Sequence, residues 1–324
     1  ALLCIWYNNG TNSAPCTVAG LHEEMTMKSK VKAAVGQVKI VSLDPKKNVL
    51  RMKQCVEEIL DEKDVDLILF PELANTGYII AGDLDFAREF RKCAEPIQGY
   101  TTNALSELSR KYNVYIVVGI AESHPKIPGT LYNSSVLIGP NGVVGVHHKV
   151  HIPGDEKHFF YAGNTLEVYR VDIGNIGMTI CYDWAFGELT RILALKGMEI
   201  MCTGYQWPKP GGWSGGEGRL PYIPDRLRSI ATYQAMSNRI YVMTCNPVGS
   251  YLDYEFDGHN AIMSPIGETL AYAEEEGKEE VLFAEFSNDR FLEARSEVGE
   301  AVEFRDRRPE LYGMLTQRWE DCEG

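Results

Sequence analysis

The chain of 324 residues lacks the features that would assign it to a membrane or a nucleic acid. No apolar run approaches the ~20 residues that an α-helix needs to span a bilayer. Lysine and arginine form no cluster, and the net charge of −13 disfavours a nucleic-acid or anionic-membrane surface. Hydrophobic residues make up 44% and charged residues 24%, as in ordinary globular proteins. We therefore expect neither nucleic acid nor membrane as a partner.

The eight cysteines form no CxxC pair and show no regular spacing, which argues against a disulfide framework. Several lie in apolar segments, as buried free thiols usually do, so a reducing, cytoplasmic compartment is the better interpretation. Histidines gather between positions 147 and 158, which invites a metal site. However, His147 and His148 should face opposite sides of a strand, and no HExxH motif is present. We expect no metal and no cofactor.

Short apolar runs alternate with helical patterns, which predicts an α/β protein with mixed sheets. The pair Asn141–Gly142 between two apolar runs is a strong signal for a hairpin. Strands are predicted at residues 31–40, 66–70, 114–120, 131–138, 143–149, 166–173, 176–180, 199–203, 240–244, 261–264, 268–273 and 281–286. Helices are predicted around residues 52–60, 84–93, 102–112, 188–197 and 225–238.

We find no internal repeat and no linker, so we expect a single domain over residues 28–287. Residues 1–27 fit no element and are expected to be a leader that is disordered or left over from cloning. Residues 288–324 are charged but carry large apolar side chains, so we expect a C-terminal arm that packs on a partner subunit. A solvated tail is the alternative. The apolar side chains of the arm are Phe291, Phe304, Leu311, Tyr312, Leu315 and Trp319.

One cysteine, Cys181, lies where a nucleophile would be placed. It follows the predicted strand 176–180 and precedes a helical stretch, so its thiol is expected at a sharp strand-to-helix junction. Backbone N–H groups at the start of a helix favour a thiolate or an oxyanion nearby. These are the conditions that covalent catalysis requires.

Two further segments carry the partners that such a thiol would need. Glu72 follows a buried strand, at the end of the sheet where α/β active sites gather. Lys149 closes a hairpin strand, and Glu156 follows seven residues later. Taken singly, each has an ordinary alternative as an exposed loop carboxylate or a solvated edge charge. A Cys–His nucleophile pair is also conceivable, but no histidine stands out for it.

Taken together, Glu72, Lys149 and Cys181 resemble the Glu–Lys–Cys triad of the nitrilase superfamily of carbon–nitrogen hydrolases. The resemblance spans about residues 30–290, with three motifs in the family's order. The motifs are Phe70–Pro71–Glu72–Leu73 with Thr76–Gly77–Tyr78, His148–Lys149–Val150–His151, and Thr179–Ile180–Cys181–Tyr182–Asp183 with Glu188. Glu156, with Phe160 and Gly163, matches the second family glutamate. The resemblance implies a four-layer α-β-β-α sandwich of mixed sheets and a homodimer or higher homo-oligomer.

The resemblance also implies a mechanism that uses no cofactor. Glu72 would accept the thiol proton as Cys181 attacks an amide or nitrile carbon. Lys149 and the backbone N–H of Tyr182 would stabilise the tetrahedral oxyanion. Ammonia would leave, and water activated by Glu72 would cleave the thioester. Glu156 would orient Lys149 and the substrate nitrogen.

The residues after Cys181 indicate a branch of the family. Tyr182–Asp183 is similar to the amidase and ω-amidase branches, whereas nitrilases tend to have Trp-Glu there. Ala185 stands where those branches often have arginine, which argues against a substrate with a free carboxylate. We predict amide hydrolysis, with nitrile hydrolysis and N-carbamoyl amine hydrolysis as alternatives. A silent binding or assembly protein is the non-enzyme alternative, and the presence of the triad argues against it.

Aromatic side chains are predicted to form the acyl pocket. The loop 204–224 is rich in glycine, proline and tryptophan and lies just past a strand end. We therefore expect it to line the pocket or to form a lid over it. A surface or interface loop is the alternative. The expected substrate-binding residues are Tyr78, Tyr182, Trp184, Tyr205 and Trp207, and the same loop also holds Trp213 and Tyr222.

Overall fold

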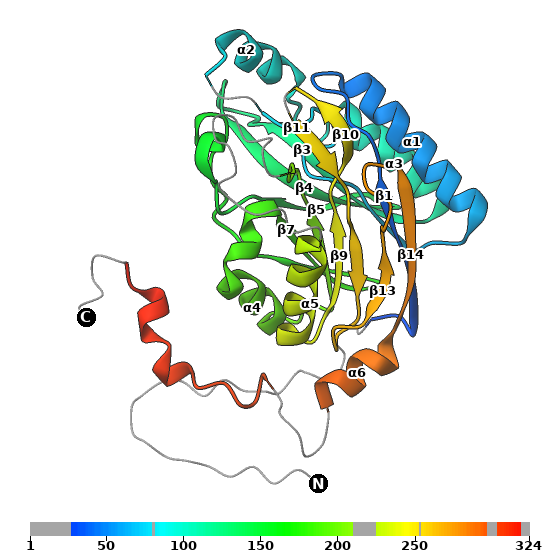
Figure 1. The fold of residues 1–324 in the computed structure, drawn as a ribbon, viewed down its shortest axis with the longest axis vertical. Coiled ribbons are helices and arrows are strands. Elements are labelled where there is room, and N and C mark those ends of the chain that lie inside the picture. Colours follow the sequence, from blue (N-terminus) through cyan, green and yellow to red (C-terminus); the bar gives the residue numbers. More distant parts are fainter. Residues whose placement is uncertain (1–26, 80–81, 210–224, 253, 297–302, 319–324) are drawn as a thin grey trace.

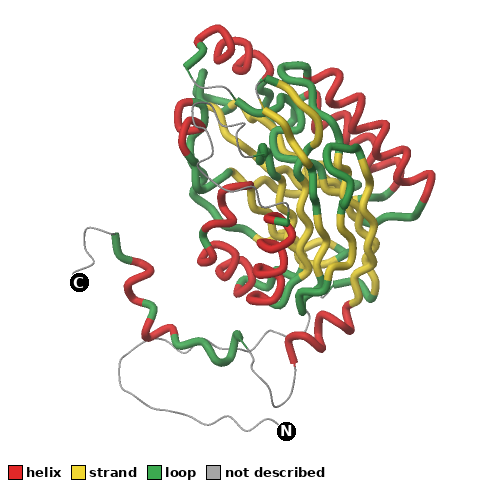
Figure 2. The backbone as a smooth tube through the Cα atoms, in the orientation of Figure 1, coloured by secondary structure: helices red, strands yellow, loops and turns green. Residues whose placement is uncertain are grey.

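The computed structural model describes residues 27–79, 82–209, 225–252, 254–296 and 303–318. Within them, two mixed six-stranded sheets lie face to face (Figure 2). Helices cover the outer face of each sheet (Figure 1). The mixed sheets agree with the sequence pattern, and the layers form the four-layer α-β-β-α sandwich that the family resemblance implies.

The first sheet has parallel strands at its centre and antiparallel strands toward both edges. Its order is β14, β1, β2, β3, β4, β5. The strands are β1 (Lys30–Gln37), β2 (Leu67–Leu69), β3 (Tyr115–Ser123), β4 (Leu131–Gly139), β5 (Gly142–His148) and β14 (Glu280–Ser287). The predicted Asn141–Gly142 hairpin is confirmed, because β4 and β5 pair directly across it.

The second sheet has the same plan, with three parallel strands flanked by antiparallel ones. Its order is β13, β12, β9, β8, β7, β6. The strands are β6 (Val168–Val171), β7 (Gly174–Ile180), β8 (Ile200–Gly204), β9 (Tyr241–Cys245), β12 (Ala261–Met263) and β13 (Thr269–Tyr272). A separate two-stranded hairpin, β10 (Val248–Tyr251) with β11 (Tyr254–Asp257), follows β9.

Each helix buries apolar side chains in one of the cores of the sandwich. The first begins after Asp44, whose side chain accepts a hydrogen bond from the backbone N–H of Lys47 at 3.1 Å, a normal N-cap. It is followed by two helices on the same side of the sandwich, two on the other, and one after β14. The helices are α1 (Pro45–Glu62), α2 (Leu84–Cys93), α3 (Tyr100–Tyr112), α4 (Gly187–Leu195), α5 (Arg226–Asn238) and α6 (Asn288–Ser296).

Three apolar cores separate the four layers, as strand alternation requires. Ile68 of β2 faces outward into the core beneath α1, whereas its neighbour Leu69 faces inward. The central core joins both sheets, with Leu69 in the same cluster as Met178 of β7 and Cys202 of β8. A third core lies beneath α4 and α5 and includes Leu193. The two sheets are therefore fixed against each other from the inside.

The structure differs from the predicted elements at three places. The predicted strand 31–40 ends at Gln37, because Lys39 leaves the sheet and bridges to Val248 of the β10–β11 hairpin. That hairpin was not predicted, since its strands are short. Helix α6 extends the body beyond residue 287, and its Phe291 is buried in the central core rather than in an arm.

The residues described at the two ends of the chain can be compared with the expected leader and C-terminal arm. Met27 is buried, and its backbone N–H donates to Glu199 Oε1 at 3.1 Å, so the body includes this residue. Residues 1–26 and Trp319 lie outside the described residues. Leu311 and Leu315 are exposed, while Phe304 packs against the core under α4. No helix within the described ranges has both the length and the apolarity to cross a membrane.

Candidate active site

Cys181 lies at a strained turn directly after β7. Its φ of +41° is a left-handed conformation that L-residues rarely adopt and that is found mainly where function requires it. The turn is a short 3₁₀ helix, Cys181–Ala185, and α4 begins only at Gly187. The strand-to-helix junction predicted from the sequence is therefore confirmed, with a 3₁₀ turn rather than α4 next to the thiol. Cys181 is partly exposed.

A buried cluster of one lysine and two glutamates lies beside this turn. Lys149 is fully buried, and its Nζ is 2.8 Å from Glu72 Oε1 and 2.8 and 2.9 Å from the two oxygens of Glu156. Glu72 follows β2, Lys149 follows β5, and Glu156 lies in the 3₁₀ segment Gly154–His158. The three residues that the sequence places in separate motifs thus make direct contact.

Glu72 is held in place by tight packing of its own backbone against two glycines. The segment lies between Gly119 of β3 and Gly204 of β8, that is, between the two sheets. A Cβ on Gly119 would come within 2.5 Å of Glu72 Cα, and one on Gly204 within 2.6 Å of Glu72 N. Leu73 adds a φ of +45° to the same turn. Only glycine at both positions allows the carboxylate to reach Lys149 from this depth.

Asn133 and Tyr78 complete the hydrogen bonds of the cluster. Asn133 Nδ2 donates to Glu72 Oε1 at 2.6 Å and to Glu156 Oε2 at 3.3 Å, so it bridges the two carboxylates. Tyr78 OH donates to Glu156 Oε1 at 2.8 Å. In the part of the chain that the structure describes, Glu72 Oε2 is buried without a hydrogen-bond partner. One carboxylate oxygen of Glu72 is therefore available to accept a proton.

The electrostatics of the cluster raise three pKa values. Burial, reinforced by the charge of Glu156, raises the pKa of Glu72 despite the nearby ammonium of Lys149. Burial alone would lower the pKa of Lys149, but Glu156 and Glu72 outweigh it and raise that pKa above its ordinary value. Burial and the charge of Glu72 raise the pKa of the Cys181 thiol well above its usual range. At neutral pH Cys181 is thus a thiol, which needs a base to become a nucleophile.

Gln206 joins the thiol to the glutamate turn. Its backbone N–H lies close enough to Cys181 to lower the pKa of that thiol, against the larger effect of burial. Its side chain donates to the carbonyl oxygen of Glu72 at 2.8 Å and accepts a hydrogen bond from Tyr251 OH. An N–H near the sulfur is positioned to stabilise negative charge that develops there.

The predicted aromatic residues occupy different positions around the site. Trp184 and Trp207 stack with ring centroids 5.6 Å apart, and Tyr205 stacks on Trp207 at 6.2 Å. Tyr182 is exposed, and Tyr78 is buried against Glu156 rather than in this stack. Trp213 and Tyr222 of the predicted lid lie outside the described residues.

Several residues of the site were missed in the sequence. Asn133 stands out there only as the start of an Asn-Ser-Ser glycosylation pattern, yet it is fully buried. Gly119, Gly204 and Gln206 carry no local signal, since their roles arise from contacts between distant strands. Asp183 belongs to the nucleophile motif, but nothing in the sequence indicates that it contacts histidines. Only the three-dimensional structure reveals these partners.

The two neighbouring histidines at the end of β5 face opposite sides of that strand. His147 Nε2 lies 3.2 Å from Asp183, whereas His148 Nε2 lies 2.7 Å from Glu122, on the opposite face of β5. Within the described ranges, no group of three or more histidine, cysteine or acidic side chains could hold a metal ion.

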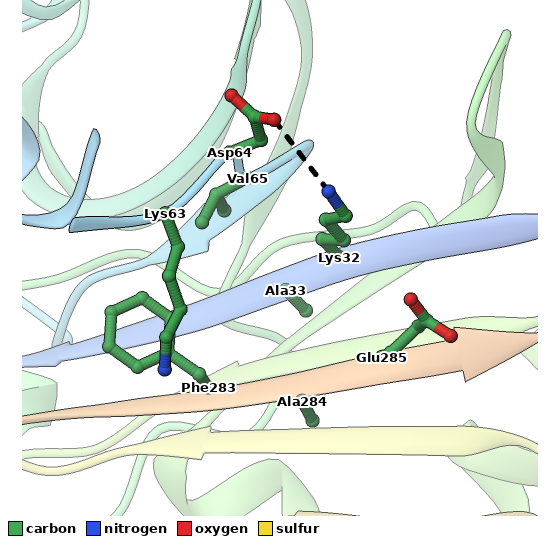
Figure 3. Close-up of a pocket in the computed structure, with 8 residues that line it drawn as sticks. All are labelled: Lys32, Ala33, Lys63, Asp64, Val65, Phe283, Ala284 and Glu285. Atoms are coloured by element: carbon green, nitrogen blue, oxygen red, sulfur yellow. Dashed lines mark ion pairs between the residues drawn. The ribbon is translucent and has the colours of Figure 1, made fainter. Parts of the chain in front are cut away.

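A surface hollow at the opposite end of the first sheet has a different character (Figure 3). It lies at the start of β2, whereas Glu72 follows the end of that strand. Lys32 and Asp64 form an ion pair of 3.8 Å across it, and Lys63 Nζ lies 3.9 Å from the ring centroid of Phe283. Its charged groups thus already have partners, and it holds no candidate nucleophile.

Comparison with known proteins places this geometry in context. A family model described as carbon-nitrogen hydrolase matches residues 32–295. A nitrilase from Pyrococcus abyssi is 33% identical over 285 residues, covering 87% of this chain and 99% of the relative. A chloroplastic omega-amidase from Arabidopsis thaliana is 30% identical over 292 residues, covering 85% of this chain and 72% of that protein. A crystal structure of a carbon-nitrogen hydrolase from Helicobacter pylori superposes with a TM-score of 0.76 at 25% identity, covering 90% and 99% of the two chains.

Proposed function

Because the chain belongs to the carbon–nitrogen hydrolase family of the nitrilase superfamily, we propose that it hydrolyses a small amide through a thioester on Cys181. The observation that carries this proposal is the buried contact of Lys149 with Glu72 and Glu156 beside a thiol whose pKa is raised. A thiol of that kind requires a base at the moment of attack. Glu72 can serve as one, since its Oε2 has no hydrogen-bond partner among the described residues.

The first half of the reaction forms the acyl-enzyme. Cys181 Sγ attacks the amide carbon while its proton passes to Glu72. The C=O bond opens to an oxyanion, which Lys149 and the backbone N–H of Tyr182 stabilise. Glu72 then returns the proton to the leaving nitrogen, the C–N bond breaks and ammonia departs.

The second half releases the acid. Water attacks the thioester carbon and gives a proton to Glu72, and the C–S bond breaks as Cys181 recovers its proton. The sum is amide plus water to carboxylic acid plus ammonia. Glu156 does not change its protonation, since its role is to hold Lys149 in place through two hydrogen bonds and to orient the substrate nitrogen. The raised pKa of Glu72 suits both halves, because it makes the carboxylate a stronger base than an ordinary one.

The stacked rings of Trp184 and Trp207 support an acyl pocket beside Cys181. We assign substrate contact to these two rings, to Tyr182 and to Tyr205. Tyr78 has a different role, because its hydroxyl holds Glu156. Nitrile hydrolysis is the second candidate, since a relative named nitrilase is 33% identical to this chain.

Ammonia release across matched amides, nitriles and N-carbamoyl amines tests the proposal, with Cys181→Ala as the control. The proposal expects the highest turnover with an amide and an acyl adduct on Cys181 in the intact mass. Faster release from the nitriles would favour the second candidate. Absence of turnover with every substrate, together with a Cys181 that electrophiles do not label, would favour a silent binding protein.

We also propose that the chain forms a homodimer or a higher homo-oligomer. Large apolar side chains remain exposed on the outer helices α4 and α5 and on residues 311–315, and exposed groups of that size usually contact another surface. They are Ile192, Leu195, Tyr233, Met236, Leu311, Met314 and Leu315. Sedimentation at micromolar concentration would test this, and a monomer of 36.3 kDa would contradict it.

A reducing compartment such as the cytoplasm fits this chemistry, because the mechanism requires a free thiol at Cys181. Among the cysteines that the structure describes, Cys55, Cys93, Cys202 and Cys245 are free thiols as well. Localisation of a tagged chain would test this assignment, and secretion would overturn it.

A further inference from the structure

The carboxylate of Asp183 connects the nucleophile turn to the lysine strand. It is fully buried, two residues after Cys181. Its Oδ2 accepts from the backbone N–H of Ile180 at 3.1 Å and lies 3.2 Å from His147 Nε2. Its Oδ1 accepts from the backbone N–H of His151 at 3.0 Å and lies 2.9 Å from His151 Nδ1. Each oxygen therefore has two partners, which uses the full capacity of a carboxylate.

The two histidines flank Lys149 in the sequence, two residues on either side. His147 is the inward-facing residue near the end of β5, and His151 follows the strand. An ionised carboxylate can only accept, so both ring nitrogens that face Asp183 carry protons. Burial would raise the pKa of Asp183, but hydrogen bonds from His147 and His151 outweigh it and hold that pKa well below its usual range. Asp183 is thus a permanent anion between the two segments.

This arrangement holds two features that the reaction needs. The bond from Ile180 N–H closes the turn in which Cys181 has a φ of +41°. The contact with the His147 ring, and those with the backbone N–H and ring of His151, hold the residues on both sides of Lys149. The His151 ring also stacks on Phe186 of the same turn, with centroids 3.5 Å apart.

We propose that Asp183 is a positioning residue that sets the distance between the Cys181 sulfur and the Lys149 ammonium by clamping His147 and His151. The inference rests on the proposed function, in which the sulfur and the ammonium act on one substrate. A misplacement of about 1 Å between reacting groups can lower a rate by about 100-fold without altering how the substrate binds. A residue needed only for folding would instead change the amount of active enzyme.

The test compares Asp183→Asn with His148→Gln, in full-length protein. Asn has nearly the same size as Asp. However, its NH₂ group replaces one carboxylate oxygen, so two donors would face each other where that oxygen now accepts a hydrogen bond. His148 is the matched control, because it lies next to His147 and points to Glu122 on the other face. The measurements are kcat, KM, the melting temperature and the rate at which iodoacetamide alkylates Cys181.

For Asp183→Asn we expect kcat to fall roughly 10- to 100-fold with KM changed less than about 3-fold, and alkylation of Cys181 to slow. His148→Gln should stay within about 2-fold of wild type. The double variant His147→Gln/Asp183→Asn should lose no more than Asp183→Asn alone, because both changes break one connection. Unchanged kcat in Asp183→Asn, equal losses in the control, or additive losses in the double variant would overturn the proposal.

Two further readouts keep the test decisive. If Asp183→Asn does not fold, His151→Gln can replace it, because it removes one ring donor to Asp183. It should also lower kcat with little change in KM, but by a smaller factor. If the wild-type enzyme releases no ammonia from any amide, the proposed function fails. The alkylation rate still compares the variants in that case, and equal rates would overturn the role of Asp183.

Discussion

Replacing Lys149 by Met tests the charge balance of the site most directly. The substitution removes three hydrogen bonds of 2.8–2.9 Å and leaves the carboxylates of Glu72 and Glu156 without their shared cation. Removing one partner of a buried ion pair costs about 3–5 kcal/mol of stability, because the remaining charge is left uncompensated. We expect a loss of that size at pH 8, from denaturant unfolding of variant and wild type.

The loss should depend on pH with a definite sign. Without the lysine, one of the two carboxyl groups has a raised pKa in the folded state. The folded variant therefore keeps a proton on this group at pH values above about 4.3, where the same group is deprotonated in the unfolded chain. The folded variant then binds more protons than the unfolded one, so its stability falls as pH rises through the raised folded pKa. The slope is at most about 1.4 kcal/mol per pH unit for one proton. The difference from wild type should therefore be about 1–2 kcal/mol smaller at pH 5.5 than at pH 8.

Lys63→Met is the matched control. The Lys63 side chain is 52% exposed, so its loss should change stability by about 0.5 kcal/mol or less, independently of pH. The reasoning is refuted if Lys149→Met costs less than about 1 kcal/mol, or if its cost is the same at pH 5.5 and pH 8. In the same variant, kcat should fall by about 10²–10³, because an oxyanion donor is lost.

Four further predictions concern the base and its surroundings. Glu72→Gln should lower kcat by about 10²–10⁴ in a steady-state assay, because the general base is gone, and retained turnover would exclude Glu72 from that role. In wild type, kcat/KM should fall on the acid side at a pH above the ordinary carboxyl value of about 4.3, since burial raises the pKa of Glu72 and only its deprotonated form accepts a proton. Asn133→Ala should move this acid limb to higher pH, because the Asn133 hydrogen bond lowers that pKa, and an unmoved limb would contradict the assignment. Gly119→Ala should lower kcat, because the new Cβ would come within 2.5 Å of Glu72 Cα, and unchanged kinetics would show that the glutamate turn tolerates displacement.

The sequence was sufficient for the parts of the fold that depend on local pattern. The strand that ends at Phe70 and the strand that ends at Ile180 are short apolar runs that stop at turn residues, and the structure has both. The nucleophile turn could be anticipated for the same reason. The hairpin after β9 could not, since its strands have only four residues each, and its bridge to Lys39 joins residues far apart in the sequence.

The candidate site divides in the same way. Charged residues in motifs, such as Glu72 and Lys149, can be found because three motifs together resemble those of a known family, although each residue alone has an ordinary alternative. The residues that hold them could not be found. Asn133 and Gly204 are unremarkable in sequence, and their importance comes from contacts across the interface between two sheets. Contacts between residues far apart in the sequence produce no periodic pattern from which they could be predicted.

The pKa values of Glu72 and Cys181 are raised by the same main cause, and this explains why burial need not inhibit the reaction. Burial disfavours the thiolate of Cys181 and the carboxylate of Glu72 alike. Proton transfer between them depends on the difference of their pKa values, so the rise at Glu72 offsets part of the rise at Cys181. The cluster carries a net charge of −1 before the transfer, from two carboxylates and one ammonium, and the same charge afterwards. Attack therefore moves negative charge toward the substrate without creating any in the buried site, and Lys149 stays paired throughout.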